Sequence, residues 1–200
     1  SSNNQTELEQ RFGNSRVYSN EFYTYIEDDF EINNRLKINA GLHFSVFILK
    51  DDTYTSLQPR ISVRYKISDK TSIKGSYAAM AQYIHLLTNQ GIGLPTDLWV
   101  PSTERIKPQS SFQGAIGIAS SIFKKYELSV EGFYKEMDNV VSFKEGSSLF
   151  VLEGWEEKVT QGSGKAYGAE VFLQKKKGDF SGWIGYTLSW NFRQFDVAPS

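Results

Sequence analysis

The stretch LQPRISVRYKI at Leu57–Ile67 alternates apolar and polar side chains without a break. A period of two places successive side chains on opposite faces of a β-strand, so one face is apolar and the other carries Arg60, Arg64 and Lys66. Pro59 cannot donate to a β-ladder, and we expect a bulge or the rim of a sheet there. At ~3.3 Å per residue and a tilt near 45°, a strand of about 11 residues covers the ~25 Å apolar band of an outer membrane. Strands of soluble proteins are usually about half as long.

Similar alternation recurs along the whole chain and predicts eight strands. The first is expected near Val17–Ile32. The other seven are predicted at Leu36–Phe47, Leu57–Ile67, Ser72–Gln82, Phe112–Ala119, Tyr126–Glu136, Ala166–Gln174 and Phe180–Phe192. Aromatic side chains on the apolar faces, such as Tyr65 and Trp190, lie toward strand ends. This placement suits the level of lipid headgroups, where an apolar ring and a polar tip each meet their own solvent.

The connections between these strands alternate between short and long. Tight polar turns are expected at 32–35, 68–71, 120–125 and 175–179, and the intervening connections are larger, notably 83–109 and 137–165. Alternate connections of an up-and-down meander lie at the same end of the sheet, so the short turns share one end and the long loops the other. Outer-membrane β-barrels show this asymmetry, with short periplasmic turns and long extracellular loops. We predict an all-β, antiparallel up-and-down meander that forms part of a transmembrane β-barrel.

A soluble β-sandwich is the alternative fold. Its strands also alternate apolar and polar side chains, and its loops also lie at both ends. The length of the strands, the aromatic side chains at their ends and the sorting of the loops favour the barrel.

The composition excludes several classes of protein. A net charge of −1 gives no indication of a nucleic-acid partner. The chain has no apolar run of about 18 residues, which excludes a transmembrane helix, and no cysteine, which excludes disulfides and thiolate sites. Ser1–Ser15 is polar and has no signal-peptide core, and the chain stops soon after a strong strand. We expect residues 1–200 to be a fragment of a larger barrel domain.

The sequence shows no catalytic or metal-binding constellation. His43 and His85 have no partner at catalytic or metal-ligand spacing, and neighbouring acids such as Asp28 and Asp29 point to opposite sides of a strand. The segment GSGK at 162–165 lacks the first glycine and the final Ser or Thr of a phosphate-binding loop. We therefore predict no catalytic residue, no metal site and no cofactor.

The segment GIGLPTDLWVP at 91–101 differs from an ordinary connector. It is rich in Gly and Pro and carries an apolar cluster, and long loops with structure of their own are often functional. We predict that the extracellular connection 83–109, which contains this segment, contacts a ligand through His85, Asn89, Asp97 and Trp99. Packing within a self-folded loop is the alternative role for each of these side chains.

Several segments together carry a family likeness. They are Leu57–Tyr65, Ser76–Tyr77, Gln82–Leu87, Leu94–Ser102, Lys107–Gln109, Glu131–Val141, Gly164–Glu170 and Lys175–Ser189. On these segments the chain resembles the C-terminal barrel region of a TonB-dependent outer-membrane receptor of the type with a carboxypeptidase-regulatory-like extension. The likeness covers nearly the whole chain, and its motifs indicate the family but no substrate.

The resemblance implies about eight strands of a barrel of roughly 22, whose lumen holds an N-terminal plug domain absent from residues 1–200. Such a receptor lies in the outer membrane of a Gram-negative bacterium and contacts its lipid. It takes up a scarce nutrient with energy delivered by a TonB-type coupling protein. The nutrient, whether siderophore, cobalamin, glycan or peptide, and a surface lipoprotein over the loops stay open. Candidates for contact with the plug or with lumen water are Arg60, Arg64, Lys66, Glu127, Glu131 and Glu170.

Three classes of function stay open at this point. The preferred class is active transport of a nutrient, which involves binding and gating without bond chemistry. An outer-membrane barrel enzyme, such as a protease or lipase, would need a histidine beside an acid or serine at the rim. A soluble carbohydrate-binding or adhesive β-sandwich would be a detergent-free monomer with a two-sheet core.

Overall fold

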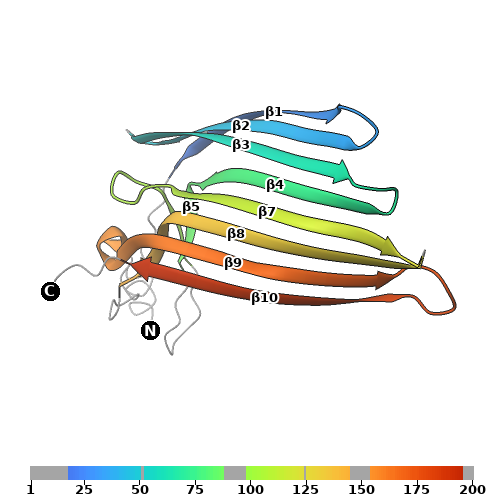
Figure 1. Cartoon of the computed structure of the whole chain (residues 1–200). Helices are drawn as coiled ribbons and strands as arrows, with labels where there is room; N and C mark the ends of the chain where they lie inside the picture. The colour runs from blue at the N-terminus through green and yellow to red at the C-terminus, as the bar shows by residue number, and fades with distance from the viewer. Residues whose placement is uncertain (1–17, 51, 88–97, 124, 145–153, 196–200) are drawn as a thin grey trace, which may run out of the picture.

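The computed structural model of the chain describes residues 18–50, 52–87, 98–123, 125–144 and 154–195, and its main feature is one long-stranded sheet (Figure 1). Eight strands pair in an antiparallel meander in the order β1-β2-β3-β4-β7-β8-β9-β10. Their bounds are β1 Asn20–Glu31, β2 Leu36–Leu49, β3 Asp52–Lys66, β4 Thr71–Gln82, β7 Gln109–Ile122, β8 Tyr126–Phe143, β9 Val159–Lys175 and β10 Gly182–Phe195. The predicted all-β, up-and-down meander is confirmed.

Three smaller elements lie between the long strands. β5 Ile84–Leu87 and β6 Leu98–Pro101 pair with each other as a separate two-stranded sheet, and η1 Trp155–Lys158 is a short 3-10 turn before β9. The described part of the chain has no helix that is long and apolar enough to cross a membrane.

Each predicted strand is present, and β8 and β9 reach further than expected. They extend into the predicted 137–165 loop, β8 to Phe143 and β9 from Val159. Their pairing shifts register between Met137 and Val140. A β-bulge of this kind breaks the period of two, and for that reason the sequence pattern ended at the bulge although the strands continue.

The connection between β2 and β3 is short, which corrects the expectation of larger connections at this end of the sheet. Leu49 pairs with Asp52, so only Lys50 and Asp51 join the two strands. Lys50 has a φ of 49°, a left-handed conformation that a tight hairpin requires. The residues that follow, Asp52–Ser56, are polar and do not alternate with apolar side chains, but they are rich in Thr and Tyr, which favour strands.

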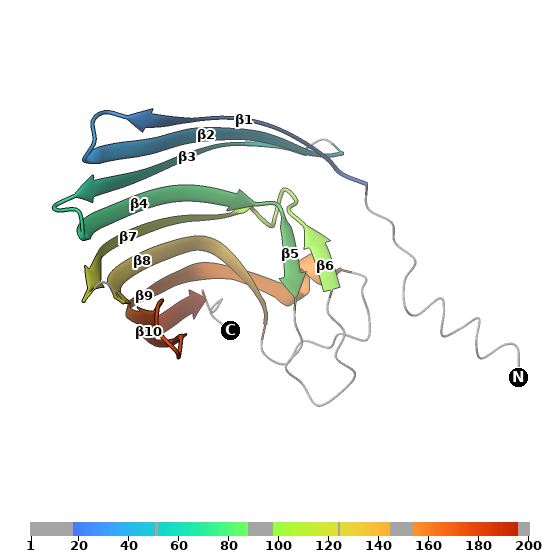
Figure 2. The ribbon, with the colours of Figure 1, turned by 90° about the vertical axis from the view of Figure 1, so that its right-hand side faces the viewer.

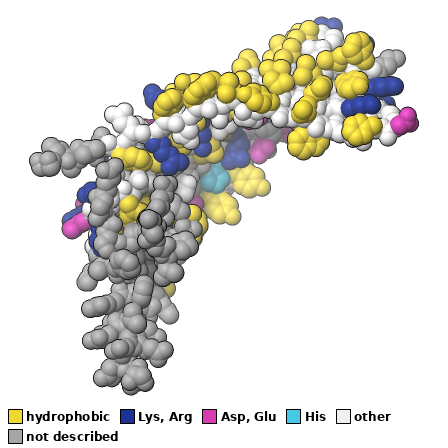
Figure 3. Space-filling model, turned by 90° about the horizontal axis from the view of Figure 1, so that it is seen from below, with side chains coloured by type: hydrophobic (Ala, Val, Ile, Leu, Met, Phe, Trp, Pro, Cys, Tyr) yellow, Lys and Arg dark blue, Asp and Glu magenta, His cyan; other side chains and the backbone are white. Residues whose placement is uncertain are grey.

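The register places the predicted apolar and polar rows on separate faces. Ile61 lies opposite Ala40 and Tyr77, whereas Arg64 lies opposite Lys37 and Lys74, and opposed residues of an antiparallel pair share a face. Figure 3 shows hydrophobic side chains gathered along one side of the sheet. Hereafter these are the apolar face and the inner face.

No second long-stranded layer covers the apolar face within the described residues. Ile116 and Ile184 keep 67% and 68% of their surface exposed there. Figure 2 shows the sheet curving from β1 to β10, with β5 and β6 beside one end of it. The β-sandwich alternative is therefore wrong for the described part of the chain, because its aliphatic rows do not bury one another across two layers.

The buried apolar side chains gather at the end of the sheet where β5 and β6 lie. One cluster contains Phe47, Leu49 and Tyr83. A second contains Leu87, Val100, Ile106 and Val159, with Trp155 packed against it. These clusters pack residues of the connection between β4 and β7 against residues of β2 and β9.

Candidate functional site

The ladder between β3 and β4 stops halfway along β3. β4 pairs with β3 only from Arg60 to Lys66, whereas β2 pairs with β3 from Asp52 onward. The break begins at Pro59, which has no N–H to donate, so the predicted irregularity at this proline is a gap in the sheet. Figure 1 shows β3 and β4 diverging toward the end that carries the long loops. We call residues 52–59 of β3 and 79–82 of β4 the seam.

The side chain of Gln58 bridges the seam. Its Oε1 accepts a hydrogen bond from the N–H of Ala81 at 3.2 Å, and its Nε2 donates to the hydroxyl of Ser45 at 3.0 Å. The Ser45 hydroxyl shares a further hydrogen bond of 2.8 Å with the hydroxyl of Tyr83. Gln58, Ser45 and Tyr83 are all buried. The network matters because a buried donor or acceptor that loses its partner costs about 1–3 kcal/mol.

Tyr83 directs the chain from β4 over the inner face. It follows the last residue of β4, and its ring stacks on Phe47 with centroids 5.0 Å apart and planes 3° from parallel. Phe47 and Ser45 belong to the row of β2 that contains Lys37, which is an inner-face row. The loop between β4 and β7 therefore starts on the inner side of the wall.

The segment 102–108 fastens this loop to β3. The hydroxyl of Tyr54 donates to the carbonyl of Thr103 at 2.7 Å. The N–H of Glu104 donates to Oδ2 of Asp52 at 3.0 Å. These two bonds engage side chains of β3 within the seam, where β4 no longer pairs.

The same segment is also fastened to β8 and β9. The side-chain amide of Gln161 accepts from the N–H of Lys107 at 3.1 Å and donates to the carbonyl of Lys107 at 2.8 Å. Asn139, at the bulge of β8, donates from Nδ2 to the carbonyl of Pro108 at 3.0 Å. The loop thus bridges two parts of the sheet that are separated by β4 and β7.

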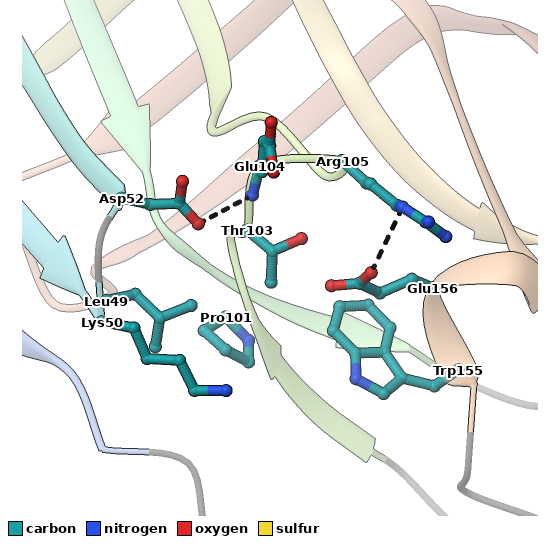
Figure 4. Close-up of a pocket in the computed structure, with 9 residues that line it drawn as sticks. All are labelled: Leu49, Lys50, Asp52, Pro101, Thr103, Glu104, Arg105, Trp155 and Glu156. Carbon is teal, nitrogen blue, oxygen red and sulfur yellow. Dashed lines mark hydrogen bonds and ion pairs between the residues drawn. The ribbon is translucent and has the colours of Figure 1, made fainter.

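A cavity of about 310 Å³ lies at this end, between the β2–β3 hairpin, the segment 101–105 and η1 (Figure 4). Its lining residues are Leu49, Lys50, Asp52, Pro101, Thr103, Glu104, Arg105, Trp155 and Glu156. Arg105 lies 4.0 Å from Glu156 and 3.6 Å from Glu157, measured between side-chain N and O atoms. Lys50 has no carboxylate within ion-pair distance among the described residues. The cavity therefore presents the ammonium group of Lys50, the indole ring of Trp155 and the carboxylate of Glu104, which also has no ion-pair partner among the described residues.

The predicted ligand residues have separate environments. His85 is buried, with 3% of its surface exposed, and its Nε2 lies 3.0 Å from the hydroxyl of Ser102. Trp99, in contrast, keeps 63% of its surface exposed. Asn89 and Asp97 lie outside the described residues. The role of all four in ligand binding stays a prediction, and the partner of His85 supports the alternative in which it packs within the loop.

The predicted lumen residues all lie on the inner face. Across the strands, Glu31, Lys37, Arg64, Lys74, Gly117, Glu131, Glu170 and Thr187 are opposed in turn. Arg60 lies beside Gly41, where an added Cβ would stand 2.9 Å from Arg60 Cγ, so the glycine leaves room for the arginine stem. Glu127 forms an ion pair with Lys176 at the short-turn end.

The described residues contain no cluster of three or more His, Asp or Glu side chains that would hold a metal ion.

Burial of His85 in the β5–β6 hairpin lowers the pKa of its imidazole below the usual value. The neutral imidazole is thus the form that the hairpin holds against Ser102.

Several residues of this end were not found from the sequence. Gln58 and Ser45 looked like ordinary polar positions of alternating strands, and Asp52 and Glu104 are 52 residues apart in the chain. Pro59 was the one local signal, since it marks where the ladder has to stop. Contacts across such distances depend on how the loop folds back, which no local pattern contains.

Comparison with known proteins gives one family and several similar structures. The family model described as "TonB dependent receptor-like, beta-barrel" matches residues 1–199. Comparison with curated protein sequences gives no match.

Three solved structures illustrate the likeness. The FrpB iron transporter from Neisseria meningitidis (F3-3 variant) superposes with a TM-score of 0.64 at 14% identity, over 96% of this chain and 29% of that one. The alcaligin outer-membrane receptor FauA from Bordetella pertussis gives 0.58 at 17%, over 88% and 31%. The ferric-catecholate import receptor Fiu from E. coli K12 gives 0.60 at 15%, over 88% and 28%. The chain thus spans less than a third of the length of these proteins, and at such identities the likeness shows the fold.

Replacing Gln58 with Leu should loosen the loop end. The substitution leaves the N–H of Ala81 and the Ser45 hydroxyl without this partner, at a cost of about 1–3 kcal/mol. Hydrogen exchange in the full-length protein should show faster exchange at Ala81 and in residues 102–106, with the short-turn end unchanged. Gln58→Glu keeps an acceptor for Ala81 and should give an intermediate rate, whereas equal rates in all three proteins would contradict the bridging role.

Acidification should destabilise the β5–β6 hairpin through His85. Its pKa is lowered in the folded hairpin, so below the usual value of about 6.5 the unfolded hairpin binds a proton that the folded one does not. Stability is therefore lost as the pH falls from about 6.5 toward the folded pKa. Protection of the amides of residues 84–87, corrected for intrinsic exchange, should drop between pH 7.5 and pH 5.5. His85→Gln should remove this dependence, and a persistent drop in that variant would assign it to another group.

Proposed function

This chain belongs to the TonB-dependent receptor β-barrel family, and we propose that it forms part of the wall of a receptor that binds a scarce nutrient and imports it with energy from an inner-membrane complex. Members of this family are outer-membrane proteins of Gram-negative bacteria, and the outer membrane is therefore the location of the chain. The family and its similar structures are receptors and transporters, not enzymes. The barrel-enzyme alternative is accordingly dropped.

The observation that carries the proposal is a sheet with an apolar and a charged face, in which no second layer covers the apolar face within the described residues. On the apolar face, Ile116 and Ile184 are exposed by about two thirds of their surface, which water does not favour. On the inner face, charged side chains follow one another across neighbouring strands. A barrel wall suits both faces, because the apolar face would contact the hydrocarbon of the membrane and the charged inner face would contact a hydrated lumen or its plug.

The remaining parts of the proposal concern partners that this chain does not contain. A plug domain of the full-length protein occupies the lumen, and a TonB-type coupling protein transmits energy to it. The plug is proposed because a wide lumen without one would be an open pore, and the coupling protein is proposed because uptake against a gradient needs a source of energy. The lumen candidates Arg60, Arg64, Lys66, Glu127, Glu131 and Glu170 line the wall that a plug would meet.

The nutrient meets the end of the sheet that carries the long loops. In the proposed orientation this end is extracellular, because the short turns lie at the other end. Its cavity combines the ammonium of Lys50 with the ring of Trp155, and Trp99 is exposed on β6. A ligand with an anionic group beside an apolar or aromatic part fits these side chains.

A lysine on the apolar face should destabilise the barrel in lipid. Ile116 lies in the middle of β7, and a Lys or Arg facing the midplane of the bilayer costs roughly 2–4 kcal/mol. Urea unfolding of the full-length protein in lipid vesicles should show this loss for Ile116→Lys. Ser76→Lys, on the inner face of β4 beside the residue paired with Ile116, is the matched control and should cost much less. Equal losses would mean that the apolar face does not contact hydrocarbon.

Removing the cavity side chains should reduce uptake without changing the barrel. We would measure uptake by cells carrying the full-length receptor, with a panel of a ferric siderophore, cobalamin, an oligosaccharide and a peptide. For the compound that is imported, Lys50→Gln with Trp155→Ala should reduce apparent affinity about tenfold, equivalent to ~1.4 kcal/mol. Lys177→Gln with Trp183→Ala makes the same changes toward the short-turn end and should have no effect. Uptake that continues without the energy-coupling protein would refute active transport.

A further inference from the structure

We propose that the short-turn end of the sheet binds the headgroups of anionic phospholipids in the leaflet that it faces. The short turns are residues 32–35, 67–70, 123–125 and 176–181, and we call them together the rim. The inference rests on the proposed function, because it needs the sheet to be the wall of a barrel in a membrane. It goes further in assigning a class of lipid to one end of that wall.

The rim is basic, and the opposite end of the sheet is not. The acids of the rim are Asp69 and Asp179. Its cations are Arg35, Lys70, Lys124, Lys125, Lys176 and Lys177. The connections at the other end, 50–51, 83–108 and 144–158, contain more Asp and Glu than Lys and Arg. An excess of positive charge is therefore gathered at one end of the sheet.

Every turn of the rim also carries an exposed large apolar side chain. These side chains are Ile32, Ile67, Phe123 and Phe180. Phe123 is the extreme case, because 84% of its surface is exposed and a φ of 50° holds it in a left-handed conformation. Such a ring is unfavourable in water, but it is favourable at the boundary between lipid headgroups and acyl chains. The combination of a cation with an apolar side chain in each turn is typical of a surface that lies at a membrane interface.

Backbone hydrogen bonds hold the turns of the rim in place along one end of the sheet (Figure 1). Three such bonds, each 2.8 Å long, run from an N–H to a carbonyl: Lys66 to Arg35, Ser121 to Lys70 and Lys176 to Lys125. Each turn joins two adjacent strands, so neighbouring turns are separated by twice the strand spacing, which is ~10 Å. The cations of the rim therefore form a row.

Three neighbouring turns of this row each present a cation without a partner. Arg35, Lys70 and Lys125 are exposed, and none has a carboxylate within 4.0 Å among the described residues. Lys176, in contrast, forms an ion pair with Glu127. The three unpaired groups are thus available to an anionic ligand.

The spacing of the row favours a lipid leaflet over a small soluble anion. At a separation of ~10 Å, a phosphate-sized anion would contact one cation at a time, whereas a leaflet presents phosphates to all the turns at once. The attraction of Lys and Arg to an anionic membrane surface increases with each cation near it. Phosphatidylglycerol has a phosphate and no ammonium group, whereas the ammonium of phosphatidylcholine offsets its phosphate. The rim should therefore select anionic over zwitterionic phospholipid.

The composition of the lipid beside the rim tests the proposal. The full-length receptor carries a fluorescent label at Ser68→Cys, in the second turn, and is placed in phosphatidylcholine vesicles. A small fraction of the lipid carries a nitroxide quencher on its acyl chain, either as phosphatidylglycerol or as phosphatidylcholine. The two quenching efficiencies give the relative concentration of each lipid beside the label. Because each Lys or Arg near the surface attracts anionic lipid, phosphatidylglycerol should be enriched about fivefold.

Two matched variants separate the rim from the rest of the wall. The rim variant, Arg35→Gln, Lys70→Gln and Lys125→Gln, should lose most of the enrichment. The inner-face variant, Arg64→Gln, Lys74→Gln and Lys135→Gln, loses the same charges toward the lumen and should keep the enrichment. Enrichment that persists in the rim variant, or that disappears equally in the inner-face variant, would overturn the proposal.

A second measurement needs no charge variant. Raising salt from 50 mM to 500 mM should reduce the enrichment in the labelled receptor, because salt screens charge interactions, and an unchanged enrichment would overturn the proposal. Equal quenching by the two lipids at low salt would overturn this inference alone, in favour of a soluble anionic partner or of hydration. A label that neither lipid quenches would lie away from the membrane, which would overturn the proposed function as well.

Discussion

The structure depends on one constraint, which is that backbone N–H and C=O groups cannot be left unpaired in hydrocarbon. Seven antiparallel ladders join the eight long strands, and six of them run along most of the strand length. Because each ladder satisfies the backbone laterally, the side chains are free to differ completely between the two faces. That freedom allows an apolar face with Ile116 and an inner face with Arg64 on the same thin wall.

One ladder is incomplete, and it breaks in the half of the sheet that carries the long loops. The β3–β4 pairing ends at Arg60, next to Pro59. Beyond that point the side chain of Gln58 accepts from the N–H of Ala81, and the side chains of Tyr54 and Asp52 bond to the backbone of Thr103 and Glu104. The loop is therefore attached to β3 where the ladder is interrupted. The β2–β3 hairpin, the loop and η1 surround one cavity there.

The sequence was sufficient for what is periodic and insufficient for what is not. Strand positions, the two faces and the placement of Arg64 and Glu131 on the inner face all follow from a period of two, which each strand carries locally. The bulge near Asn139 shifts that period, so the continuation of β8 to Phe143 escaped the pattern. The Gln58 network and the cavity depend on a loop that folds back over more than 20 residues of chain, and the sequence marked only Pro59, beside which the β3–β4 pairing stops. The ligand contacts of His85, Asn89, Asp97 and Trp99 remain predictions.

The inner wall shows how electrostatics adds to a fold that it does not determine. Charges on an open, hydrated wall interact weakly, so the like-charged neighbours Arg64 and Lys74, and Glu131 and Glu170, cost little while water separates them. A surface that displaces this water would strengthen every charge interaction and would also remove the hydration of each group. Its binding would be favourable only if it supplied opposite charges to both pairs, since a buried charge without a partner is strongly unfavourable. Charged pairs of this kind restrict which surfaces can pack against this part of the wall.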